Sequence, residues 1–386
     1  MLPATPEANT RRRCRVVIIK RVDGLKRFIE VIPESGIDLI NVFRLIEVGD
    51  IVYSRTTREV KKERADGKMD SERVQVVLGV EVESKAIDPL MRRIRFTGRI
   101  IYESRELDLL GKYHTVTLYP GVEIRIESKK DFQRLKSFSD AFAGRREKPM
   151  RVICVSLDDY EIAAAEFTNG GLNVIYSRHL PQVDKSISWG EAAYDESFDE
   201  VIEAIKNRLM EYKDADVAVF GPEVFAQRFM KYLRKKSKMV YERVKAICST
   251  SIGGEAGISE LLRSRNVPEF MSELKPFIDA IEAEKFIEAM SKNPERVAIG
   301  LDEVLMAWEM GAVEKALVSE GYLWGNMGDE RLERLLAAAE RGKLDLRILL
   351  DGLESSEKIS RLGGAVAFLR YPVPLREIRK SVGDQG

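Results

Sequence analysis

The stretch Ser35-Gly-Ile-Asp-Leu-Ile-Asn-Val-Phe-Arg-Leu-Ile-Glu-Val-Gly-Asp50 places one amphipathic segment among short runs that are typical of strands. Its apolar residues recur at helical spacing up to Ile46, and Gly49-Asp50 then turns the chain into Ile51-Val-Tyr53. The apolar and β-branched runs around it predict strands at residues 15–19, 27–32, 51–53, 74–82, 93–96, 115–119 and 122–126. Many short strands with one helix predict a small β-barrel.

After this barrel, the pattern changes to alternating strands and helices. The hydrophilic stretch 129–149 predicts a linker. Strands are then predicted at 150–157, 161–168, 172–178, 217–220 and 241–248, with helices at 198–212, 224–233 and 256–263. A last region alternates helices at 301–310 and 330–341 with strands at 316–318, 345–350 and 365–371. Because 386 residues exceed one ordinary core, we expect α/β domains at 149–271 and 272–376 behind a barrel at 1–138.

The composition excludes several classes of protein. With 44% hydrophobic and 33% charged residues, and with no apolar run of the roughly 18 residues that a membrane span needs, the chain is expected to be soluble and cytoplasmic. We also expect it to be a monomer. The three cysteines are far apart, which argues against a zinc module or a disulfide framework. Two histidines, His114 and His179, leave little for a histidine-based metal site or a Ser-His-Asp relay.

The net charge of zero conceals an asymmetry along the chain. Residues 1–149 carry 31 Lys and Arg against 23 Asp and Glu, a balance of +8. Residues 150–271 have a balance of −3, and residues 272–386 one of −5. This distribution indicates that the first domain contacts nucleic acid and the others contact proteins, with chance clustering as the alternative.

A basic segment between two predicted strands is the candidate RNA-binding site. Its cations lie within ten residues: Arg55, Arg58, Lys61, Lys62 and Arg64. Arg93 and Arg95 join them, because strand alternation places both on one face. Lys and Arg neutralise phosphates and release counterions, and loops on a rigid barrel often bind ligands. The alternative is a solvated hairpin with internal ion pairs, since acidic residues are interspersed here.

Three other motifs have simpler structural explanations. Ser249-Thr-Ser-Ile-Gly-Gly254 opens a helix after a strand, as a phosphate-binding loop does, but it lacks the Walker lysine. Asp158-Asp159 suits either a metal-binding carboxylate pair or a polar hairpin. We expect His114 to be a hydrogen-bonded structural histidine.

The order of these segments resembles the archaeal Pelota family, whose members are paralogues of class-one translation release factors. In the first domain, the resemblance rests on residues 35–50, Thr56-Thr-Arg-Glu-Val60, Arg95-Phe-Thr-Gly-Arg99 and Leu110-Gly-Lys-Tyr-His-Thr115. In the last domain, it rests on Gly300-Leu-Asp-Glu-Val304, Gly311-Ala-Val-Glu-Lys315 and Gly363-Gly-Ala-Val-Ala-Phe-Leu-Arg-Tyr-Pro372. The order and spacing of these segments carry the resemblance, rather than any single motif.

The resemblance implies a multidomain α+β and α/β fold. The first domain would be an Sm-like β-barrel, the middle one ribonuclease-H-like, and the last one similar to ribosomal proteins that bind kinked RNA. It also implies ribosome rescue in no-go and non-stop mRNA surveillance. The protein would enter the A site of a stalled ribosome on its mRNA, delivered by the GTP-bound elongation factor that carries tRNA in archaea. It would then separate the subunits with the recycling ATPase, without a required cofactor.

Two local features qualify this resemblance. Release factors carry a Gly-Gly-Gln loop that positions water, whereas residues 181–194 and the rest of this sequence contain none, so we expect no peptide release. Many relatives show Pro-Gly-Phe after a middle-domain strand, where this chain has Gly221-Pro-Glu-Val-Phe225. The resemblance indicates a GTPase contact there, through Gly221, Pro222 and Phe225.

An enzymatic alternative is a divalent-metal-dependent endoribonuclease that cleaves mRNA on stalled ribosomes. Such cleavage needs converging carboxylates that hold a divalent metal cation. Glu34, Asp38, Glu47 and Asp50 are available in the first domain, but barrel turns and helix ends explain each of them. We therefore assign no catalytic residue and no metal ligand, and we expect the protein to act by binding.

Overall fold

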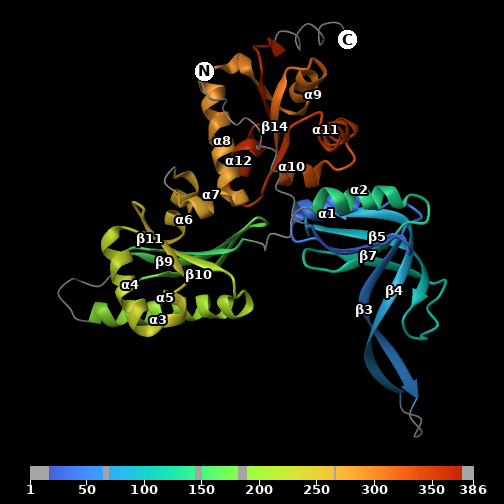
Figure 1. Cartoon of the computed structure of the whole chain (residues 1–386), viewed down its shortest axis with the longest axis horizontal. Helices are drawn as coiled ribbons and strands as arrows, with labels where there is room; N and C mark the ends of the chain where they lie inside the picture. Colours follow the sequence, from blue (N-terminus) through green and yellow to red (C-terminus); the bar gives the residue numbers. More distant parts are fainter. Residues whose placement is uncertain (1–16, 64–68, 144–149, 181–188, 265–266, 376–386) are drawn as a thin grey trace, which may run out of the picture. The chain divides into compact units, whose positions relative to one another are not determined.

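The computed structural model of the chain describes residues 17–63, 69–143, 150–180, 189–264 and 267–375. The chain forms two compact units, Met1–Arg146 and Glu147–Gly386 (Figure 1). No helix within the described residues is long and apolar enough to cross a membrane.

The described residues of the first unit form a seven-stranded antiparallel sheet in the order β1-β2-β7-β3-β4-β5-β6. Its strands are β1 (Ile18–Asp23), β2 (Phe28–Ile32), β3 (Ile51–Glu63), β4 (Met69–Asp88), β5 (Arg93–Glu103), β6 (Tyr113–Leu118) and β7 (Ile124–Glu127). Alternate residues of β4, such as Leu78 and Val80, are fully buried, so one face of the sheet forms the core.

Helix α1 (Gly36–Leu45) confirms the predicted amphipathic helix. It begins with a capping box, in which the Asp38 amide donates to Ser35 Oγ at 3.2 Å and the Ser35 amide donates to Asp38 Oδ2 at 3.0 Å. Leu39 and Val42 on its inner face are completely buried.

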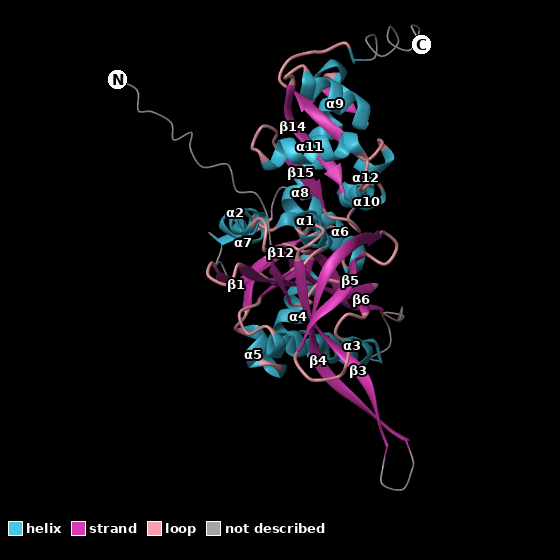
Figure 2. Ribbon diagram, turned by 90° about the vertical axis from the view of Figure 1, so that its right-hand side faces the viewer, coloured by secondary structure: helices cyan, strands magenta, loops and turns pink. Residues whose placement is uncertain are grey.

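Two predictions for the first unit were wrong. The charged segment after Tyr53 is not a loop, because β3 continues through it to Glu63 against β4. Beyond Ser54, β3 pairs with β4 alone among the described strands, and β4 before Leu78 likewise pairs only with β3. The result is a two-stranded ribbon, residues 55–63 and 69–77, which we call the arm (Figure 2).

The predicted linker 129–149 was the second error, because it contains helix α2 (Phe132–Ala143). Leu135 and Ser139 of this helix are buried at i,i+4 spacing, which the many charged neighbours concealed. The domain boundary predicted at residue 138 therefore falls inside a helix.

The second unit contains a five-stranded sheet, counted over its described residues, in the order β10-β9-β8-β11-β12. The strands are β8 (Val152–Leu157), β9 (Glu161–Thr168), β10 (Gly171–His179), β11 (Asp216–Gly221) and β12 (Val244–Ser249). Helices α3 (Trp189–Glu211), α4 (Glu223–Lys236) and α5 (Lys238–Tyr241) share a core with one face. Helices α6 (Gly254–Arg263) and α7 (Glu269–Ser272) share a core with the other.

A second sheet of this unit has four described strands in the order β13-β16-β14-β15. They are β13 (Val297–Ile299), β14 (Val313–Ser319), β15 (Leu346–Leu349) and β16 (Ala365–Leu369). The helices around them are α8 (Lys275–Lys292), α9 (Leu301–Glu309), α10 (Glu320–Gly325), α11 (Glu330–Glu340) and α12 (Glu354–Arg361). The sequence analysis missed β13, α10 and α12, which have three, six and eight residues.

Helix α8 contributes to one core of each sheet of the second unit. Near its start, Phe277 packs on Phe167 of β9 with ring centroids 5.1 Å apart. About two and a half turns further on, Phe286 packs in the core of the four-stranded sheet. The division of this unit into domains at 149–271 and 272–376 stays a prediction.

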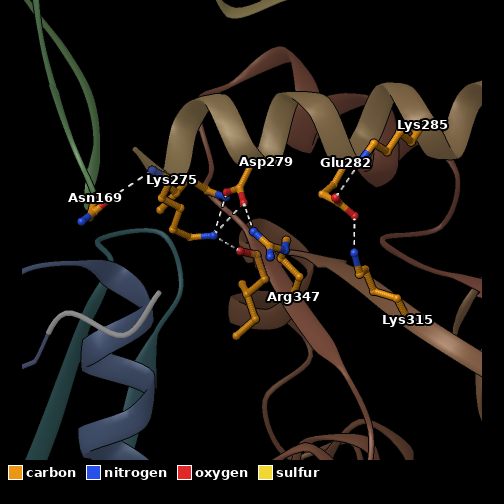
Figure 3. A network of polar contacts seen from close by, with 9 residues as sticks. Asn169, Lys275, Asp279, Glu282, Lys285, Lys315 and Arg347 are labelled. Carbon is orange, nitrogen blue, oxygen red and sulfur yellow. Dashed lines mark hydrogen bonds and ion pairs between the residues drawn. The ribbon is translucent and has the colours of Figure 1, made fainter. Parts of the chain in front are cut away.

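A buried polar network fixes the first turns of α8 (Figure 3). Lys275 Nζ donates to both Asp279 carboxylate oxygens, at 2.9 and 2.7 Å, and to the carbonyl of Ile348 in β15. The Leu350 amide donates to Asp279 Oδ2 at 3.0 Å, and the Lys275 amide donates to Asn169 Oδ1 at 3.1 Å. The network therefore joins α8 to the β9–β10 turn and to the edge of the four-stranded sheet.

Candidate functional site

Arg55 and Arg58 lie on the arm but on opposite faces of β3. Arg55 is exposed, whereas Arg58 is half-buried. The Arg58 guanidinium lies 2.6 Å from Nδ1 of His114 on β6, measured from Nη2. Burial and the adjacent Arg58 charge lower the pKa of His114, so the imidazole is neutral at neutral pH and Nδ1 accepts this hydrogen bond. The prediction that His114 is a hydrogen-bonded structural histidine is confirmed.

The other arm cations can be placed only in part. The backbones of Lys61 and Lys62 lie in β3 opposite Ser71 and Asp70, which puts both lysines on the arm. Arg64 lies outside the described residues.

Arg93 and Arg95 share one face of β5, as the alternation predicted. Both guanidinium groups reach the same acceptor, Asp88 Oδ2, at 2.8 and 3.1 Å. Hydrogen bonding to Arg93 is the main cause that lowers the pKa of Asp88, so the carboxylate is charged and offsets part of the local positive charge. The sequence analysis missed Asp88, although its position directly opposite Arg93 across a tight turn could have indicated the pair.

The carboxylates considered for a metal site have structural partners. Asp38 accepts the Ser35 amide and, at 3.1 Å, the Glu34 amide, and its burial raises its pKa to about 6. Asp50 and Glu47 both pair with Arg134 of α2, at 2.5 and 2.7 Å. Among the described residues, no group of three or more His, Cys, Asp or Glu side chains could hold a metal ion.

The glycine-rich turn before α6 is filled by the protein's own carboxylates. Glu260 accepts the Ser251 amide at 2.9 Å, and Asp158 Oδ2 accepts the Gly253 amide at 2.7 Å. A Cβ added to Gly254 would lie 2.2 Å from Glu161 Oε2, so the glycine is required for close packing. Asp158 Oδ1 also accepts the Tyr160 and Glu161 amides at 2.8 Å, which confirms the polar-hairpin interpretation of this acidic pair.

The turn from Gly221 to Phe225 joins β11 to α4. Gly221 has φ of 145°, and a Cβ there would lie 2.1 Å from the Leu157 carbonyl oxygen. Pro222 is the N-cap of α4, and Phe225 packs against the core between the sheet and α3. Val224, which the sequence analysis did not single out, is 75% exposed and is the apolar side chain that this turn presents to solvent.

Known proteins match the chain over most of its length. The sequence profile of the Pelota N-terminal domain matches residues 16–138, and the profile of domain 3 of eRF1 matches residues 278–373. A pelota homolog protein from Thermococcus onnurineus is 31% identical over 353 residues, which cover 89% of this chain and 96% of that protein. The chain belongs to the Pelota family.

Further comparisons support this assignment and the fold. A pelota homolog protein from Thermofilum pendens is 29% identical, with 89% of this chain and 96% of that protein covered. The crystal structure of the Thermoplasma acidophilum Pelota protein superposes with a TM-score of 0.62 at 18% identity, covering 92% of this chain and 99% of that one. The predicted fold class, an Sm-like barrel followed by α/β domains, is thereby confirmed.

The two profiles cover the candidate RNA-binding site but not the candidate GTPase contact. All seven cations predicted to bind RNA lie within the Pelota N-terminal profile. The Gly221–Phe225 turn lies between the two profiles, in a segment that neither of them matches.

Proposed function

We propose that this protein rescues stalled ribosomes in mRNA surveillance, without peptide release. It enters the vacant A site with a GTP-bound elongation factor and separates the subunits together with the recycling ATPase. Membership of the Pelota family supports this role, and the arm is the observation that carries it.

The arm has the shape and charge that a narrow RNA path requires. Nine residues separate Ser54 from Glu63, which corresponds to about 30 Å of extended chain. Over that length β4 is the one described strand whose backbone pairs with β3, so a ribbon two strands wide extends from the barrel. It carries Arg55, Lys61 and Lys62 with acidic residues interspersed, and residues 1–149 as a whole have a charge balance of +8. Such a ribbon can lie along RNA and neutralise phosphates.

Ribosome binding by the full chain tests this role. The variant Arg55→Ala/Lys61→Ala/Lys62→Ala should bind stalled ribosomes more weakly. The slope of log K against log salt concentration should also become flatter by about 2, because each phosphate contact to a single strand contributes about 0.7 to that slope. Its subunit-splitting rate should fall in parallel. The control Lys26→Ala/Lys112→Ala/Lys136→Ala removes the same charge from exposed positions elsewhere in the first unit. Equal effects in the two triple variants would refute the role of the arm.

We also infer that the acidic second unit binds the GTPase and that the turn before α4 contributes to the contact. Val224 supports this, since an exposed apolar side chain next to a rigid turn suits a protein interface. Val224→Glu should weaken capture of the GTP-bound elongation factor at least tenfold. Met210→Glu on α3, where Met210 is 64% exposed, is the matched control. If both variants retain wild-type capture, the turn is not the contact.

The endoribonuclease remains the alternative, and a direct assay distinguishes it. Glu34→Gln/Glu47→Gln leaves the two buried carboxylates, Asp38 and Asp50, in place. We expect this variant to split ribosomes at close to the wild-type rate. Loss of splitting together with loss of metal-dependent RNA cleavage, at unchanged ribosome binding, would favour the nuclease.

A further inference from the structure

The outward face of the first-unit sheet carries a row of aligned residues from four strands. Arg125 of β7 pairs with Tyr53 of β3, Tyr53 pairs with Gly79 of β4, and Gly79 pairs with Tyr102 of β5. The residues that follow Gly79 and Arg125, Val80 and Ile126, are buried in the core on the opposite face. The two tyrosines therefore flank a glycine on the face that points away from the core.

Gly79 makes room for the two rings. A Cβ at this position would lie 2.6 Å from Tyr53 Cε1 and 3.0 Å from Tyr102 Cβ. Without it, the rings meet edge-on across β4, with centroids 5.7 Å apart and planes inclined by 65°. This is a favourable geometry for an aromatic pair, and it limits the motion of both rings.

Tyr53 is the fixed member of the pair. Its hydroxyl donates to Glu127 Oε2 at 2.9 Å, and the Arg125 guanidinium lies 5.7 Å from its ring centroid. Arg125 is itself paired with Glu30 at 2.7 Å. Burial and the Glu127 hydrogen bond raise the pKa of Tyr53 to about 12, so its hydroxyl remains a donor at neutral pH. Tyr102, by contrast, is 46% exposed, and it offers an oriented ring to solvent.

The charged residues around this row are distributed asymmetrically. Arg55 follows Tyr53 on the same face of β3, on the side toward the tip of the arm, and it is exposed. Arg105, just after β5, is exposed as well. On the other side of the row, Glu81 follows Gly79 on the outward face of β4 and is exposed. A phosphate next to Tyr102 is therefore attracted toward Arg55 and repelled from Glu81.

We propose that Tyr102 is a stacking platform for one unpaired base of single-stranded RNA, with the adjoining phosphate at Arg55. The proposal rests on the proposed ribosomal function and deepens it. Every base offers a flat aromatic face, so stacking on an oriented ring adds affinity without selecting a sequence. Because Tyr53 and Gly79 already hold the ring, little ordering is needed when the base arrives.

Binding of two RNA probes to the full chain tests this platform. One probe is a 12-nucleotide oligoadenylate, and the other is an abasic ribose-phosphate chain of the same length and charge. Tyr102→Leu should weaken oligoadenylate binding about tenfold and leave abasic binding unchanged. Tyr102→Phe should retain wild-type binding of both. Tyr371→Leu in the second unit is the control, since Tyr371 has the same exposed fraction of 46%.

A second measurement keeps the test independent of how well the leucine variant folds. The three tryptophans of the chain all lie in the second unit, so Tyr102→Trp introduces a reporter into the first. Oligoadenylate should quench its fluorescence, whereas the abasic chain should not. Equal quenching by both probes, or equal loss of both in Tyr102→Leu, would overturn the platform.

The same experiment separates this proposal from the proposed function. If Tyr102→Leu binds both probes like the wild type while the arm triple variant loses both, the platform is refuted and the arm assignment stands. If the wild-type chain binds neither probe nor stalled ribosomes, both proposals are refuted.

Discussion

Charged side chains differ in role between the arm of the first unit, where they are available for binding, and helix α8 of the second, where they stabilise the fold. Arg55 on the arm is exposed, whereas Lys275 and Asp279 on α8 are buried and bonded to each other. An exposed cation can exchange its counterions for a phosphate. A buried one must be neutralised inside the protein, because desolvation of an unpaired charge costs several kcal/mol. Burial therefore decides whether a charge serves binding or structure.

The largest expected effect comes from breaking the buried pair. Asp279→Ala leaves Lys275 buried without its counterion, so we expect the second unit to lose about 3–5 kcal/mol of unfolding free energy. Urea unfolding followed by tryptophan fluorescence measures this, since the tryptophans report on the second unit. Glu288→Ala removes an exposed i,i+4 pair with Lys292 on the same helix and should cost at most about 0.5 kcal/mol. Similar losses in the two variants would contradict the importance of burial.

The buried Asp38 tests whether burial also determines the role of a charged group in the first unit. Burial raises its pKa from 3.8 to about 6, so the folded state binds more protons than the unfolded state between these values. Stability from this group is present below pH 4 and is lost as the pH rises through 6, an effect of about 2–3 kcal/mol. As the pH rises from 4 to 7, the unfolding free energy of Asp38→Asn should therefore increase by that amount relative to that of the wild type. Calorimetry of the first unit's transition at both pH values measures the difference, and parallel curves would contradict it.

The smallest effect is expected at Asp88, where two half-buried arginines share one acceptor. Asp88→Asn removes the acceptor that Arg93 and Arg95 share, and it leaves two guanidinium groups next to the sheet surface. Oligonucleotide affinity at low salt should rise about twofold, consistent with the modest energies of exposed pairs. The stability of the unit should change little. Unchanged affinity would show that these two arginines do not face RNA.

Parts of this structure could be predicted from the sequence because their apolar pattern, periodic or continuous, is rarely interrupted by charge. Helix α1 and the cores of β4, β9 and β11 fall into this class. The arm could not be predicted, because its β-propensity in Thr56, Thr57 and Val60 is masked by the intervening charges. Its strand conformation depends instead on the ladder with β4, which is a tertiary feature.

The candidate sites were less predictable for a related reason. Lys275 and Asp279 look like an ordinary solvent-exposed i,i+4 pair until the sheet beside them is known. Similarly, the sequence suggests Phe225 as a contact residue, whereas the fold packs it partly into the core and exposes Val224. The role of Gly79 depends on the register between β4 and its neighbours, which local sequence does not specify here.

The position of α8 also has a mechanical consequence. Its first turn is embedded in one hydrophobic core and its middle in another, with continuous helix between Lys275 and Lys292, a rod of about 27 Å. Because this helix is continuous and packed at both places, we expect a rotation of the five-stranded sheet to be transmitted to the four-stranded sheet. The side chains of Phe277 and Phe286 would anchor the helix in the two sheets, so that a movement of one sheet displaces the other.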